Sequence, residues 1–207
     1  MKSSLTNPRL GASCGVLFAV VLFVASGSGT HAYLAPRAVA GLAALALFIP
    51  FLAYLCNLLK TAEEEDGWLA STALVAGTVG ITIKIVSIIP ALALHRAGVS
   101  DGTPLHKLFN GFDGAATVIA LYPLAIACAA IAAVALRTAA LPRWLAAGAA
   151  VTAVALAVND AFLEASFVPA LLLFIVWTLA ASVYLLQRSW REPGRAFRGV
   201  ETAAGNR

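Results

Sequence analysis

The chain has 207 residues, of which 61% are hydrophobic and 12% are charged, and its formal net charge at pH 7 is +4. A soluble domain carries about twice that charged fraction, so the composition excludes an ordinary water-soluble protein and predicts lipid as the solvent for most of the chain. The positive charge does not indicate a nucleic-acid partner, because the basic residues gather at the ends of apolar stretches and in the C-terminal tail.

Six apolar segments follow one another along the chain. Crossing about 30 Å of hydrocarbon takes roughly 20 helical residues at about 1.5 Å each. The predicted spans cover residues 11–28, 39–59, 68–94, 112–136, 144–159 and 167–186. The predicted fold class is therefore all-α, a polytopic six-helix transmembrane bundle within residues 1–186, followed by a basic cytoplasmic tail at 187–207.

The basic residues between the spans predict the orientation. With the N-terminus inside, ten of them lie on the cytoplasmic side, and three lie outside: Arg37, Arg96 and Lys107. This bias predicts a multi-pass protein of the cell membrane with both termini in the cytoplasm. A cleaved signal peptide is the alternative for the first span, because a basic start and an apolar run at 16–24 precede small residues at 30–32.

Two connections between the spans carry motifs of their own. Thr103 followed by Pro104 is a helix-start signal, and the apolar residues after it predict a short interfacial helix in the outer loop 95–111. The acidic run at 63–66 is predicted to be a solvated turn.

One lysine falls inside a predicted span. Lys84 lies ten residues before the outer end of the third span, about 15 Å below it and roughly mid-membrane. Gly77, Gly80, Lys84, Ser87 and Ala91 share one helical face, and such a small-residue stripe predicts contact with other helices. Lys84 should therefore point into the bundle, either in a structural ion pair with a carboxylate of a neighbouring span or in a functional role.

Candidate acids gather at the outer ends of spans four to six. Asp113 opens span four with Thr117 one turn further on, while Asn159 and Asp160 close span five and Glu164 follows. Two neighbouring carboxylates in a low dielectric cannot both ionise cheaply, so one should keep its proton and act as an acid. The alternatives are a helix-dipole role for Asp113, a wet loop for Glu164 and a plain interface carboxylate at Asp160.

Aromatic residues are interleaved with these acids. Phe109, Phe112, Phe162 and Tyr122 are candidate substrate-binding residues, and Asn159 would orient a polar end of the substrate. A pocket that combines acids with aromatic faces suits an apolar ligand that gains positive charge. The alternative for each ring is an ordinary aromatic belt at the outer interface.

The chain lacks the residues that several kinds of membrane chemistry require. The three cysteines lie far apart, the three histidines fall at or beyond span ends, and no phosphate-binding Gly-x-x-x-x-Gly-Lys loop is present. We therefore expect no metal and no cofactor. Gly11 and Gly15 form a helix-contact motif, and a second copy of the chain or another membrane protein is an expected partner, besides membrane lipids.

The segment Ala135 to Ala146, in which a span ends in Arg137 and Leu-Pro-Arg-Trp starts the next, resembles a pattern common in small multi-span actinobacterial membrane proteins of unknown function. This resemblance transfers no catalytic residue. In size, helical membrane character and membrane-embedded acids, the chain is also similar to integral-membrane terpene cyclases, which protonate an alkene or epoxide of a prenylated substrate. It lacks their motifs, in particular a Trp-Glu pair within a span.

These observations predict an outward-facing cavity, formed by spans three to six and lined by acids and aromatic rings. It would act on a lipid-soluble, isoprenoid-like molecule by acid-catalysed cyclisation or isomerisation. Asp160 or Asp113 would donate the proton, with Glu164 as its partner and Lys84 as the counter-charge. The alternatives are a small proton-coupled transporter or resistance protein, and a non-catalytic membrane assembly subunit.

Overall fold

The computed structural model describes residues 8–27, 34–63, 67–99, 102–162 and 168–191. In these residues the chain forms six α-helices and no strand, which confirms the all-α class for this part of the protein. The helices are α1 (Pro8–Gly27), α2 (Leu34–Ala62), α3 (Trp68–Arg96), α4 (Pro104–Thr138), α5 (Arg143–Phe162) and α6 (Val168–Arg191).

Four of the six helices are long and apolar enough to cross a membrane. The candidate spans are Ala38–Ala62, Trp68–Leu94, Pro104–Thr138 and Pro169–Arg191, while α1 and α5 contribute the shorter apolar stretches Arg9–Val24 and Arg143–Asn159. These helices make the chain a membrane protein by length and composition. Six crossings and the orientation remain predictions.

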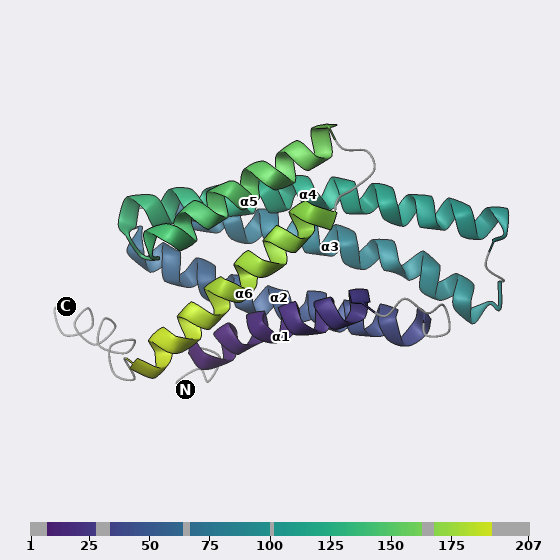
Figure 1. The fold of residues 1–207 in the computed structure, drawn as a ribbon, viewed down its shortest axis with the longest axis horizontal. Coiled ribbons are helices and arrows are strands. Elements are labelled where there is room, and N and C mark those ends of the chain that lie inside the picture. Colours follow the sequence, from purple (N-terminus) through teal and green to yellow (C-terminus); the bar gives the residue numbers. More distant parts are fainter. Residues whose placement is uncertain (1–7, 28–33, 64–66, 100–101, 163–167, 192–207) are drawn as a thin grey trace, which may run out of the picture.

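The helices form a closed ring. Each helix packs on the next in the chain, and α6 returns to pack on α1 (Figure 1). Helices α3 and α4 run side by side as a long hairpin that extends past the other helices at one end, and α6 crosses the bundle diagonally (Figure 1). Short connections place consecutive helices antiparallel, which is the usual packing in helical bundles.

Aromatic rings fill the contact between α1, α2 and α6. The Phe48 ring centroid lies 4.9 Å from that of Phe18, 5.9 Å from Phe51 and 5.5 Å from Phe174. All four side chains are buried. Tilted and edge-on aromatic pairs at these spacings stabilise a contact beyond the burial of their surface.

The Gly11 and Gly15 motif is used inside the chain. A Cβ atom at Gly11 would collide with Tyr54 of α2, and one at Gly15 would collide with Phe51 of α2 and with Ser182 of α6. The two glycines therefore allow α1 to approach both neighbours closely, as small residues do in membrane helices. Homo-oligomerisation has no support from this motif and stays a prediction.

The predicted short interfacial helix is wrong, although its start is right. The Thr103 side chain accepts a hydrogen bond from the backbone N–H of His106 at 3.2 Å, and Pro104 begins the helix. The helix then runs without interruption to Thr138. Gly111 and Gly114 do not end it, because a helical glycine keeps its N–H and costs only about 1 kcal/mol.

The acidic run before α3 contains a helix cap. The Glu63 carboxylate accepts hydrogen bonds from the backbone N–H groups of Leu69 at 3.3 Å and Ala70 at 3.2 Å. A carboxylate at this position satisfies free donors and favours the positive end of the helix dipole. Glu63 is therefore part of a cap instead of the predicted solvated turn, and residues 64–66 lie outside the described part of the chain.

Candidate functional site

Lys84 of α3 and Asp113 of α4 form an ion pair. The distance from Lys84 Nζ to Asp113 Oδ1 is 2.6 Å, and the same Nζ donates to Thr117 Oγ1 at 2.7 Å. The structure thus brings together two of the predicted site residues and the threonine one turn beyond Asp113. Of the two alternatives for Lys84, a structural ion pair with a carboxylate of a neighbouring helix describes this contact.

Helical spacing positions the cluster. Ser87 lies three residues after Lys84, and its Oγ lies 2.6 Å from Asp113 Oδ1, to which it donates. Thr117 lies four residues after Asp113 and donates its hydroxyl to the Asp113 carbonyl at 2.7 Å. Spacings of three and four put each pair on one face of its helix, so the two faces meet as a four-residue polar cluster: Lys84, Ser87, Asp113 and Thr117. Sequence reasoning placed Ser87 only in the small-residue stripe, although its spacing from Lys84 was a usable signal.

The small residues of that stripe hold the helices close. A Cβ atom at Gly77 would lie 2.5 Å from Leu52 of α2, and one at Gly80 would lie 3.0 Å from the Ala120 carbonyl of α4. Both glycines therefore face neighbouring helices, as their spacing predicts. The side chain of Ala91 lies outside the described residues.

The polar cluster is partly shielded. The side chains of Lys84 and Asp113 are 26% and 38% exposed, whereas Ser87 and Thr117 are buried. Counted from Trp68, whose ring is exposed at the start of α3, Lys84 lies about 24 Å along the helix axis. The mid-membrane depth of Lys84 stays a prediction.

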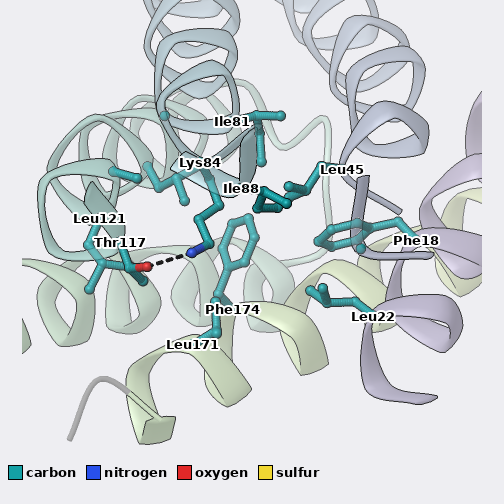
Figure 2. Close-up of a pocket in the computed structure, with 14 residues that line it drawn as sticks. Phe18, Leu22, Leu45, Ile81, Lys84, Ile88, Thr117, Leu121, Leu171 and Phe174 are labelled. Carbon is teal, nitrogen blue, oxygen red and sulfur yellow. Dashed lines mark hydrogen bonds between the residues drawn. The ribbon is translucent and has the colours of Figure 1, made fainter. Parts of the chain in front are cut away.

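A cavity of about 120 Å³ lies between α1, α2, α3, α4 and α6. Its walls include the rings of Phe18 and Phe174 and the aliphatic side chains of Leu22, Leu45, Ile81, Ile88, Leu121, Leu124 and Leu171. Lys84 and Thr117 are the polar side chains among the described residues that line it. In Figure 2 the Lys84 side chain reaches toward Thr117 with the Phe174 ring beside it. Both residues turn apolar atoms toward the cavity, so the cavity is an apolar space with the polar cluster beside it.

The cavity differs from the predicted one in its walls. The prediction used spans three to six, whereas α1 and α2 supply Phe18, Leu22, Gly41 and Leu45, and no described residue of α5 lines it. Helix α5 packs against α6 instead. The indole Nε1 of Trp177 in α6 donates to the Leu145 carbonyl of α5 at 3.0 Å.

Three of the predicted aromatic residues lie away from the cavity in the described structure. Phe112 and Tyr122 are half-exposed, Phe109 is partly buried, and none of them is among the described lining residues. Phe112 and Tyr122 each neighbour a cavity-facing or cluster residue in sequence, Asp113 and Leu121. One residue along a helix turns a side chain by about 100°, which takes both rings off that face.

The residues at the end of α5 are described only in part. Asn159 is buried and is not among the described residues that line the cavity. Helix α5 continues through Asp160 to Phe162. The side chains of Asp160 and Phe162, and Glu164 as a whole, lie outside the described residues, so the predicted Asp160 and Glu164 acid pair stays a prediction.

Phe18 and Phe174 were missed by sequence reasoning. Both lie inside uniformly apolar helices, where neither periodicity nor a polar neighbour distinguishes a cavity-lining ring from a lipid-facing one. Their ring centroids are 6.4 Å apart in an edge-on arrangement.

Comparison with known protein families, with curated proteins and with solved structures finds no match to this chain. The similarity to terpene cyclases thus rests on size and character alone. In the part of the chain that the structure describes, no group of three or more His, Cys, Asp or Glu residues is placed to hold a metal ion.

Proposed function

We propose that this protein binds a lipid-soluble small molecule in the cavity between its helices. The observation that carries the proposal is an apolar cavity of about 120 Å³ between five helices, with the Lys84–Asp113 ion pair directly beside it. Ionisable residues inside membrane proteins are costly and mark sites of function. Ligand sites commonly combine an apolar lining with a few polar groups that orient the ligand.

The cavity wall suits an apolar ligand. The lining is apolar, and the rings of Phe18 and Phe174 offer it aromatic faces. The Lys84 ammonium is engaged with Asp113 and Thr117 in the polar cluster beside the cavity. Asp113 and Ser87 act as positioning residues: Asp113 accepts from the ammonium, Ser87 donates to Asp113, and neither lines the cavity in the described structure.

The proposed setting is the cell membrane, with six crossings and both termini in the cytoplasm. In that orientation Leu22, near the end of α1, and Leu171, near the start of α6, place the cavity in the outer half of the bundle. Reporter fusions at the connections 97–103 and 139–142 test the orientation, with an external location expected for the first and a cytoplasmic location for the second.

A cavity-filling variant tests binding. Gly41 lines the cavity, and a Cβ atom there would meet nothing within 4 Å, so Gly41→Leu fills the space without a collision. Gly111→Leu is the matched control, because Gly111 is also helical and open but is exposed and away from the cavity. We expect lipid extraction and mass spectrometry to find a small molecule that co-purifies with wild type and Gly111→Leu but not with Gly41→Leu. Equal recovery from all three proteins contradicts the proposal.

Acid-base chemistry on the bound molecule, cyclisation or isomerisation, extends this proposal. We assign the proton-donor role to Asp160 with Glu164 as its partner, since Asp113 already accepts hydrogen bonds from Lys84 and Ser87. Asp160→Asn should abolish conversion of the co-purified molecule and leave its binding unchanged. Conversion at the wild-type rate by Asp160→Asn would remove the catalytic assignment and leave the binding proposal intact.

A further inference from the structure

The end of α6 lies among arginine residues from three helices. Arg188 and Arg191 belong to the last turn of α6 itself. Arg9 lies at the start of α1, which begins beside the end of α6 at one end of the bundle (Figure 1). Arg143 is the first residue of α5. All four side chains are exposed, and we call these four residues the basic patch.

Contacts made by the last turn of α6 connect the members of the basic patch. The Arg9 guanidinium lies 4.5 Å from the centroid of the Trp190 ring, within the range of a cation–π interaction. Arg188 Nη1 donates to the Ala140 carbonyl, in the connection between α4 and α5, at 3.2 Å. The start of α1 and the α4–α5 connection therefore both meet the end of α6.

Two exposed tryptophans accompany the arginines. Trp190 precedes Arg191 and Trp144 follows Arg143, and the two residues are 63% and 59% exposed. The Trp144 ring lies edge-on to that of Tyr184, with centroids 6.5 Å apart, which joins the start of α5 to α6. Tryptophans of membrane proteins gather at the level of the lipid headgroups. We therefore expect the basic patch at that level too.

The described carboxylates are engaged elsewhere. They are Glu63, which caps α3, and Asp113, which belongs to the polar cluster. The acidic run at 63–66 belongs to the α2–α3 connection, whereas the patch belongs to α5, α6 and α1. Even with Glu192, which follows α6 and lies outside the described residues, the arginines of the patch outnumber the carboxylates four to one.

Helix dipoles favour only half of the basic patch. Arg188 and Arg191 lie at the C-terminal end of α6, where the dipole favours a cation. Arg9 and Arg143 lie at the N-terminal ends of α1 and α5, where the dipole disfavours one. An anion from outside the chain offsets this cost and the mutual repulsion of the four guanidinium groups.

We propose that the basic patch binds the headgroups of lipids that carry a net negative charge. Guanidinium groups donate paired hydrogen bonds to phosphate, and each basic residue near the membrane surface adds to the attraction for anionic lipids. The exposed tryptophans favour a lipid over a soluble anion, because such rings lie in the membrane interface. No residue of the patch lines the cavity, so this lipid site is independent of the proposed function.

Native mass spectrometry of the delipidated full chain in an uncharged detergent tests the proposal. Phosphatidylglycerol, which has a net negative charge, and phosphatidylcholine, which has none, are titrated with identical acyl chains. We expect a Kd for phosphatidylglycerol about tenfold below that for phosphatidylcholine, equivalent to about 1.4 kcal/mol. The ratio should shrink as the ionic strength rises, because salt screens exposed charges.

The double variant Arg143→Gln/Arg191→Gln removes two charges from the patch. It leaves Arg9 and Arg188 in place, whose side chains contact other parts of the chain. We expect the preference for phosphatidylglycerol to fall to about twofold, since each basic residue contributes separately. Circular dichroism of the variant should match that of the wild type.

The matched control is Arg96→Gln/Lys107→Gln. It removes two exposed cations at the α3–α4 connection, near the opposite end of the bundle, and should keep the wild-type preference. Equal affinity of the wild type for both lipids overturns the proposal. So does an equal loss in the two double variants, which would reveal a general effect of net charge. Displacement of phosphatidylglycerol by millimolar glycerol phosphate would assign the patch to a soluble anion and overturn the lipid assignment.

Discussion

The polar cluster of α3 and α4 differs from two buried hydroxyls of α5 and α6, those of Thr152 and Ser182. Thr152 Oγ1 donates to the Gly148 carbonyl at 2.8 Å and Ser182 Oγ to the Thr178 carbonyl at 2.7 Å, so each is satisfied by its own helix. Lys84, Ser87 and Thr117 instead reach from one helix to the other or receive such a contact. A hydroxyl bonded to its own backbone makes no contact with a neighbouring helix, whereas the polar cluster joins α3 to α4.

The largest loss of unfolding free energy is expected from removing Lys84. In Lys84→Met, Asp113 loses its counter-ion. Breaking a fully buried pair in this way costs about 3–5 kcal/mol, and we expect about 2 kcal/mol because the side chains are 26% and 38% exposed. The measurement is the free energy of unfolding in mixed detergent and dodecyl sulfate micelles, followed by circular dichroism.

The double variant Lys84→Met/Asp113→Asn is the control for that loss, because it removes both charges together. It should recover at least half of the lost unfolding free energy. An equal loss in the single and double variants would mean that the pair does not couple α3 to α4.

The α5 and α6 region depends on a neutral contact. Trp177→Phe keeps a ring against Gly148 but removes the hydrogen bond to the Leu145 carbonyl, so we expect a loss of about 1 kcal/mol in unfolding free energy. Trp68→Phe, at an exposed tryptophan, should lose almost nothing. If Trp177→Phe lost more unfolding free energy than Lys84→Met, the order of the two regions would be the reverse of the one expected.

The smallest expected difference in unfolding free energy is between variants of two threonines. Thr117 and Thr152 are both buried and both donate to the carbonyl four residues before, but only Thr117 also accepts from Lys84 in the described structure. Thr117→Val should cost about 0.6 kcal/mol, typical of one interhelical hydrogen bond in a membrane protein, and Thr152→Val less. Indistinguishable unfolding free energies for the two variants would show that the hydroxyl of Thr117 adds nothing to the cluster.

The polar cluster was largely accessible from the sequence. A single lysine within a long apolar segment predicts a partner, and the structure supplies Asp113. The two residues belong to consecutive antiparallel helices, which pair residues at similar distances from their turn, and the observed helix bounds give such distances. Lys84 precedes the end of α3 by twelve residues and Asp113 follows the start of α4 by nine.

The cavity could not be predicted from the sequence in the same way. Phe18 and Leu171 lie in stretches of α1 and α6 whose neighbouring residues are also apolar, so no periodic pattern marks them as inward-facing. The start of α4 was misplaced for a different reason. The prediction divided one helix into a short interfacial helix and a span from residue 112, but the N-terminal cap at Thr103 and the absence of a proline between Leu105 and Tyr122 let one helix continue.

The order of synthesis gives the closed ring of helices a further meaning. Lys84 and Asp113 belong to consecutive helices, so their charges can neutralise one another as soon as α4 has entered the bilayer. Helix α6, which brings Leu171 and Phe174 to the cavity, is made last. The wall that α6 supplies is therefore absent until this last helix packs against α1, so the cavity is the last part of the bundle to be completed.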